Sequence, residues 1–97
     1  IMEKRNNKYK IQLEEVELKD GSQSGKNLTI EVDNHDDLFQ IIEMAKSKNI
    51  FPNEQQATEF ALGLKLFTEV VLRNKENPLF EDLKPAIGAF MQKLKKA

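Results

Sequence analysis

The chain has 97 residues, enough for one domain, with fifteen basic and sixteen acidic side chains and a net charge of −1. This balance gives no overall field that would favour nucleic acid or an anionic membrane. The absence of cysteine excludes disulfides, thiolate nucleophiles and cysteine-bound zinc. No apolar run approaches the roughly 20 residues of a membrane span, and the polar start IMEKRNNK does not look like a signal peptide. A cytoplasmic location is therefore expected.

The first eight residues are polar and are expected to be frayed or disordered. Ile1 stands before Met2 and is interpreted as an expression remnant. Residues 9–97 are expected to form a single domain.

Two strands are predicted in the first third of the chain. Apolar and polar residues alternate over 9–18 and again over 27–32, a pattern typical of half-buried strands. The glycine- and serine-rich segment 19–26 between them predicts a β-hairpin. The alternation shifts phase at Glu14-Glu15, which indicates a bulge or a change of buried face.

Three helices are predicted to follow. The first is expected to be capped by Asn34 and to end near residues 48–49. The second is expected to start after Asn53 and to run to about Asn74. The third starts after Asn77, and Pro85 predicts either a kink near residue 84 or a short helix followed by a longer one. The fold class is therefore α+β, in the order β-β-α-α-α, with the hairpin packed on three helices and the last helix kinked at Pro85.

The second helix is apolar on nearly every side. Only a narrow strip, with Lys65 and Glu69 among its members, looks exposed to water. We expect the surplus apolar surface to form a homodimer interface through the second helix, the third helix or the hairpin edge. The candidate interface residues on these grounds are Phe60, Gly63, Leu66, Phe67, Val70, Leu79 and Phe80.

Gly63 weakens this helix by about 1 kcal/mol relative to alanine, so some other contact should offset the loss. Close approach of another backbone is the first explanation, and a crossing of Gly63 with Gly88 is its specific form. A ligand lying against bare backbone is the alternative.

The segments NHDDLFQI, EFALGLKLFTEVVL and NPLFEDLKPAIGAFMQKLK resemble, in their order and spacing, a family of small bacterial proteins of unknown function, DUF3861. The resemblance runs from about Tyr9 to Leu94. It implies a bacterial, cytoplasmic α+β protein. It gives no indication of an activity, a cofactor or catalytic residues.

The residues themselves predict no catalytic, cofactor-binding or metal-binding site. His35 is the single histidine, and a polar residue at a helix start is its simplest interpretation. The DNHDD segment at 33–37 lacks the spacing and the glycine of a calcium loop. The carboxylate pairs Glu14-Glu15 and Glu81-Asp82 are sequence neighbours that do not make a natural dyad. The GSQSG loop leads into a strand and so lacks a phosphate-binding helix start.

The function expected is a non-enzymatic protein-interaction or ligand-binding module that acts as a homodimer, with an unknown protein partner and no membrane. The alternative is a DNA-binding regulator, because strand, helix, turn and helix over 28–72 resemble a ribbon-helix-helix repressor. The outward residues of that strand include Glu31 and Asp33, and basic residues elsewhere are scattered, so nucleic acid is an unlikely partner.

Overall fold

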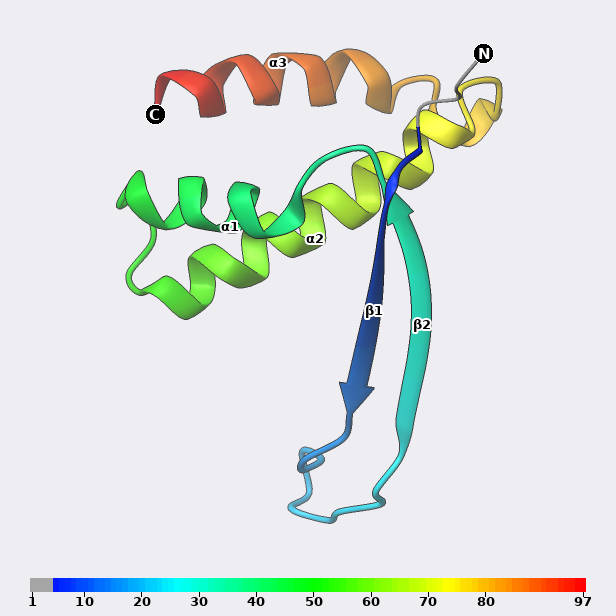
Figure 1. Ribbon diagram of the computed structural model, residues 1–97, viewed down its shortest axis with the longest axis vertical. Helices are drawn as coiled ribbons and strands as arrows, with labels where there is room; N and C mark the ends of the chain where they lie inside the picture. Colours follow the sequence, from blue (N-terminus) through cyan, green and yellow to red (C-terminus); the bar gives the residue numbers. More distant parts are fainter. Residues whose placement is uncertain (1–4) are drawn as a thin grey trace. The chain divides into compact units, whose positions relative to one another are not determined.

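A computed structural model describes residues 5–97 and has two antiparallel strands followed by three helices (Figure 1). The elements are β1 (Asn7–Glu14), β2 (Asn27–Asn34), α1 (Leu38–Ser47), α2 (Glu54–Arg73), a 3-10 helix (Pro78–Phe80) and α3 (Leu83–Lys96). The predicted α+β class and element order are confirmed. Among residues 5–97, no helix is both long enough and apolar enough to cross a membrane.

The chain divides after Asp36 into two compact units, a hairpin unit and a helical unit. Packing of the hairpin on the helices, and the single domain over 9–97, therefore stay predictions. Of the terminal segment expected to be frayed, residues 1–4 lie outside the described part of the chain, and Asn7 and Lys8 already belong to β1.

The hairpin unit pairs β1 with β2 in one continuous antiparallel register from Asn7↔Asn34 to Glu14↔Asn27. The predicted extension of the first strand to Leu18 is wrong, since β1 ends at Glu14. Beyond it the Glu15 amide still donates to the Lys26 carbonyl at 2.8 Å, and the Glu15 carboxylate accepts from the Ser24 hydroxyl. The bulge or change of buried face predicted at Glu14-Glu15 is therefore wrong, and the shift of alternation marks the end of the strand.

The loop beyond β1 closes on itself through a tight turn. The Leu18 amide bonds to the Ser22 carbonyl at 2.9 Å, and Gly21 has a φ of 86°, a conformation that favours glycine. The Ser22 hydroxyl donates to the Asp20 carboxylate at 2.6 Å and its amide donates at 2.9 Å. These two bonds, the hydroxyl first, hold the pKa of Asp20 below its ordinary value.

The helical unit begins at Asp37. Its side chain accepts hydrogen bonds from the amides of Phe39 and Gln40, at 3.1 and 3.2 Å, and caps α1. The predicted cap at Asn34 is wrong, because the Asn34 side chain accepts from the Asp36 amide at 2.9 Å and ends β2 instead.

The cap predicted for α2 is confirmed. The Asn53 side chain accepts from the Gln56 amide at 2.8 Å, and the helix runs from Glu54 to Arg73. This bond satisfies one of the amides that a helix start leaves without a partner.

The core of the helical unit is small and is centred on Ala45, Ala57 and Ala61, where α1 meets α2. Alanine lets two helix backbones approach closely but buries little apolar area. The Phe51 ring packs against this cluster and lies 4.8 Å from the Phe60 ring, centroid to centroid.

The prediction that Glu69 belongs to an exposed strip of α2 is wrong, because Glu69 is only 5% exposed. It follows Ala61 by eight residues, which places it on the same side of the helix as that buried alanine. The strip was predicted from the polarity of this side chain, and its helical position outweighs its polarity.

The last segment forms a short helix followed by a longer one, which is the second of the two forms predicted for it. The Asn77 side chain accepts from the Leu79 amide at 3.0 Å and starts the short 3-10 helix. α3 then begins at Leu83, so Pro85 lies in its first turn. An amide at that position has no partner within the helix, and proline is tolerated there without a kink inside α3.

We predict that Asn53→Ala lowers the free energy of unfolding by about 1 kcal/mol, because α2 loses its capping bond. Asp82→Ala is the matched control, since Asp82 precedes α3 but makes no side-chain capping bond. Thermal or urea unfolding followed by circular dichroism measures both. Equal effects of the two substitutions would contradict this account of the cap.

Candidate functional site

One face of the hairpin is apolar beyond the polar Asn7↔Asn34 pair at its base, and this stretch is called here the hairpin's apolar face. Its members come from three cross-strand pairs: Tyr9↔Val32, Ile11↔Ile30 and Leu13↔Leu28. Leu13 is 67% exposed, Leu28 55% and Ile30 41%. Over residues 5–36 the hairpin unit consists of two strands and their loop, as Figure 1 shows, and this described part has no further element to cover the face.

The opposite face of the hairpin is polar. Lys8 lies opposite Asp33, and Lys10 lies opposite Glu31. Cross-strand pairs of opposite charge favour this register. The hairpin therefore has one side suited to water and one side suited to an apolar partner.

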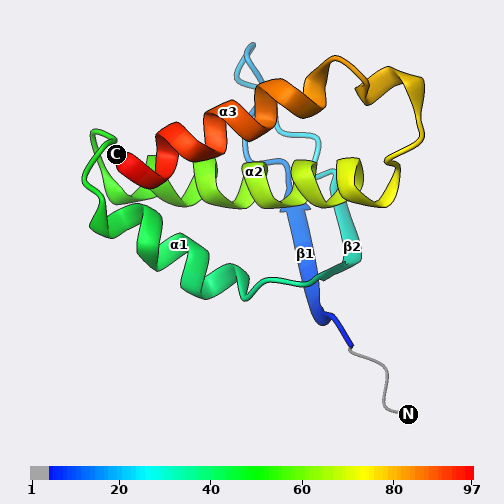
Figure 2. The ribbon, with the colours of Figure 1, turned by 90° about the horizontal axis from the view of Figure 1, so that it is seen from above.

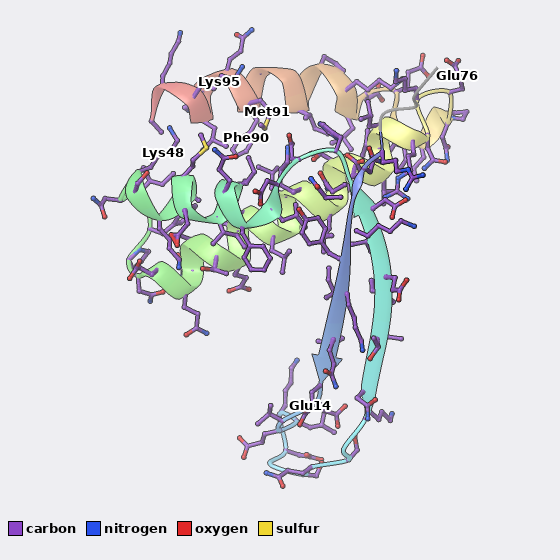
Figure 3. All side chains as sticks on the ribbon, viewed as in Figure 1. Glu14, Lys48, Glu76, Phe90, Met91 and Lys95 are labelled. Carbon is purple, nitrogen blue, oxygen red and sulfur yellow. The ribbon has the colours of Figure 1, made fainter. Side chains whose placement is uncertain are left out.

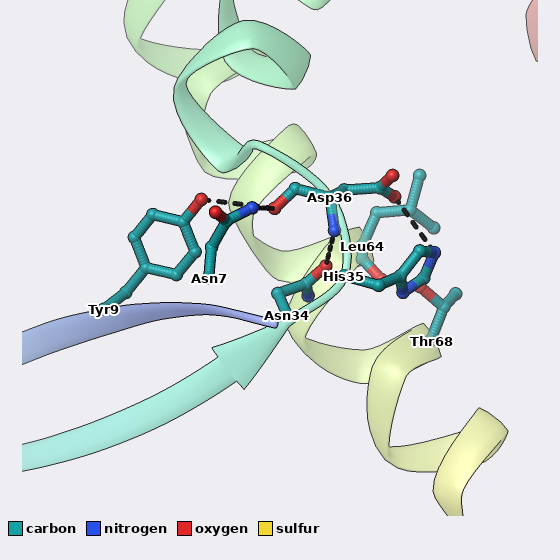
Figure 4. A network of polar contacts seen from close by, with 7 residues as sticks. All are labelled: Asn7, Tyr9, Asn34, His35, Asp36, Leu64 and Thr68. Carbon is teal, nitrogen blue, oxygen red and sulfur yellow. Dashed lines mark hydrogen bonds and ion pairs between the residues drawn. The ribbon is translucent and has the colours of Figure 1, made fainter. Parts of the chain in front are cut away.

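A polar network joins the start of β1 to the end of β2, at the base of the hairpin opposite the loop (Figure 4). The Asn7 amide group and the Tyr9 hydroxyl both donate to the Asp36 carbonyl, each at 3.1 Å. The Asp36 amide in turn donates to the Asn34 side chain, which is fully buried. These bonds hold the residues that follow β2 against the start of β1.

His35 lies at the same base, with its Nε2 atom 3.5 Å from an Asp36 carboxylate oxygen. Ser22 and Ser24 lie in the loop at the other end of the strands. Eight residues of strand separate the two ends by about 25 Å, so these serines are out of reach of the histidine. Within residues 5–97, no group of three or more potential ligating side chains could hold a metal ion.

The helical unit has a groove that the sequence did not predict. Figure 2 shows α1 and α3 running along α2, and the groove lies among these three helices with a volume of about 300 Å³. Buried Ala45 and Ala61 contribute to its lining, together with the larger side chains of Leu64, Met91 and Leu94. We call it the helical groove.

Three lysines also line the helical groove: Lys48, Lys65 and Lys95. Figure 3 shows Lys48 after α1 and Met91 of α3 around the space between these helices. The Lys48 ammonium donates to the main-chain oxygen of Ala97 at 3.3 Å. Each lysine looks like an ordinary solvated charge in the sequence, and only the packing of three helices brings them to one place.

The predicted interface residues are spread over different surroundings. Gly63, Phe67 and Val70 form an exposed stripe on α2, and Leu79 is 77% exposed in the 3-10 helix. Leu66 and Phe80 are half-buried. The half-buried Phe60 ring lies 6.1 Å from the Phe90 ring, and thus takes part in packing within the helical unit. Their role in an interface between chains stays a prediction.

Gly63 and Gly88 do not cross, and that prediction is wrong. Apart from the backbone of its own helix and its chain neighbours, a Cβ atom added at either glycine would have no neighbour within 4 Å among the described residues. Both glycines lie in the helical unit, and the distance between them therefore does not depend on where the hairpin lies. Gly63 therefore has open space around it.

A family model matches residues 7–96, and it describes a domain of unknown function with a solved structure. The chain belongs to the DUF3861 family. The resemblance carried by the three sequence motifs is thereby confirmed.

A DUF3861-like fold is also found in the crystal structure of a protein of unknown function from Pectobacterium atrosepticum. It is 35% identical in sequence, covers 95% of this chain and 99% of its own, and superimposes with a TM-score of 0.82. Comparison with the curated proteins gives no match. The family and the structural relative establish the fold and leave the activity open.

The ribbon-helix-helix alternative gains no support from residues 5–97. β2 is paired with β1 of its own chain over all eight residues. Its polar face presents Glu31 and Asp33, and acids there would repel phosphates.

We predict that Gly63→Ala and Gly88→Ala each raise the free energy of unfolding by about 0.5–1 kcal/mol. Alanine has the higher helix propensity, and neither added methyl group meets another atom. Urea unfolding of the two variants checks this. Destabilisation by Gly63→Ala alone would contradict the prediction and would place another backbone against Gly63.

Proposed function

We propose that this DUF3861 protein is a non-enzymatic interaction module that acts as a homodimer, with the hairpin's apolar face as the surface between the two copies. The exposure of Leu13, Leu28 and Ile30 on one side of a two-stranded hairpin carries the proposal. Isolated hairpins are marginally stable in water, and a hydrophobic partner surface is what they need. A second copy supplies a matching apolar face of the same length.

The free energies involved suit a reversible dimer. Fully burying a leucine or isoleucine side chain contributes about 1.5–3 kcal/mol, and side chains that are already half-covered contribute roughly half of that. Ile11, Leu13, Leu28 and Ile30 from each of two chains then contribute on the order of 6–12 kcal/mol. Association costs about 4–15 kcal/mol. The two terms are comparable, so we expect the dimer to dissociate on dilution.

The small core of the helical unit supports the same proposal. The buried apolar side chains among residues 5–97 are Leu38, Ala45, Ala57, Ala61 and Val71. Three of them are alanines, which bury little area. A chain of this length gains stability when a second copy covers further apolar surface.

A cytoplasmic location belongs to this proposal and rests on the absence of cysteine. The proposal that the module is non-enzymatic rests on the sequence, in which the residue types and spacings around His35 and the carboxylate pairs match no catalytic arrangement. Nucleic acid is not proposed as a partner.

We predict that Leu28→Lys converts the protein from a dimer to a monomer at micromolar concentration, because a charge is placed within an apolar interface. The matched control is Thr29→Lys, which adds the same charge to the neighbouring residue on the polar face. Sedimentation velocity at low and high salt gives the mass of each variant. An apolar interface keeps its dimer at high salt.

Two results would contradict this interface. A wild-type monomer at all accessible concentrations would exclude the homodimer. A dimer that survives Leu28→Lys but is lost in Phe67→Lys would move the interface to the exposed stripe of α2.

A further inference from the structure

The apolar stripe of α3 is only partly covered. Leu83, Ile87, Met91 and Leu94 follow one another at helical spacing and are half-buried, and α3 has no fully buried residue. An amphipathic helix in a globular unit normally buries such a stripe against its neighbours. Here the second half of the stripe, Met91 and Leu94, lines the helical groove.

Two contacts hold α3 over the groove. The Phe90 ring meets the Phe60 ring edge-on, with an angle of 68° between the planes. The Lys48 ammonium bonds to the main-chain oxygen of Ala97, just beyond the end of α3. These contacts restrain α3 relative to α1 and α2, and restraint of a site lowers the cost of binding.

The lining of the groove combines an apolar interior with positive charge. Apart from its three lysines, the groove is lined by alanine, leucine, isoleucine, methionine and phenylalanine side chains, and none of its lining residues is acidic. Lysine stems can lie along such a surface while their ammonium groups stay in water. This combination fits a molecule with an alkyl body and one anionic end.

We propose that the helical groove binds a single-chain carboxylic acid of medium length, such as a free fatty acid. The alkyl chain lies among α1, α2 and α3, and the carboxylate is paired with Lys48, Lys65 or Lys95. A volume of about 300 Å³ is at the lower end of the range for small-molecule sites, which favours one slender chain over a fused-ring ligand. All the lining residues belong to the helical unit, so the site does not depend on the proposed dimer.

Isothermal titration with octanoate, decanoate and dodecanoate, each below its micelle concentration, tests the alkyl part of the site. We expect saturable binding with one ligand per chain. Because each buried methylene contributes a constant free energy, every two methylenes removed should weaken binding by about fifteenfold. An absence of saturable binding, or an affinity independent of chain length, would overturn the proposal.

The charged part of the site is tested with Lys95→Glu and with dodecanol as the neutral ligand. Lys95→Glu should weaken dodecanoate binding by about threefold to tenfold and leave dodecanol binding unchanged. Lys93→Glu is the matched control, because Lys93 lies on the same helix but does not line the groove. Equal effects of Lys95→Glu on both ligands, or equal effects of both substitutions, would overturn the role of the lysine.

The location is tested with Met44→Asp, which puts a carboxylate into the groove and should abolish dodecanoate binding. Phe39→Asp on the same helix is the control, because Phe39 is exposed outside the groove. Circular dichroism confirms that both variants are folded. Binding that survives Met44→Asp would overturn the location.

Leu28→Lys should keep wild-type affinity for dodecanoate, because the hairpin does not line the groove. Loss of binding in this variant, or binding to anionic phospholipid vesicles with none to dodecanoate, would also overturn the proposal.

Discussion

A two-stranded hairpin cannot bury its own apolar face, and this constraint governs what the protein must do to be stable. Four apolar side chains lie on one side of the β1–β2 ladder: Ile11, Leu13, Leu28 and Ile30. The described residues of the hairpin unit, 5–36, include no further element to cover them. Main-chain hydrogen bonds hold the two strands in register, but exchanging bonds with water for bonds between strands yields little net free energy. Burial of the apolar face has to supply the remaining free energy that stabilises the hairpin. The proposed homodimer is one way to meet this requirement.

The helical unit meets a related limit in a different way. Its α1–α2 contact is made by Ala45, Ala57 and Ala61, which allow close approach but leave the larger apolar side chains to find other neighbours. Phe51 and Phe60 form an aromatic contact beside this cluster. α3 then lies over a groove instead of closing on a filled core. The same shortage of buried area underlies both proposals, the surface for a second copy and the site for a slender ligand.

The sequence predicts the local elements well because their signals are local. Alternation in β1 and β2, the Asn53 and Asn77 caps, and the break before Pro85 each depend on residues within one turn or one strand. Prediction from the sequence fails where a contact outside the local pattern determines the structure. Asn34 is a good helix cap in isolation, yet its side chain accepts a hydrogen bond from the Asp36 amide instead. Helical position buries Glu69 despite its charge. The groove was missed because residues about fifty positions apart, Lys48 and Lys95, meet only through packing.

Hydrogen exchange of the backbone amides, measured at several protein concentrations, tests the central claim most directly. If a second copy stabilises the hairpin, protection of the β1 and β2 amides rises with concentration, because dimerisation shifts local opening by mass action. Protection of the α2 amides beside Ala57 and Ala61 then changes much less. Hairpin amides that are equally protected at every concentration, in a protein that remains a monomer, would show that the apolar face is covered within one chain and would contradict the account.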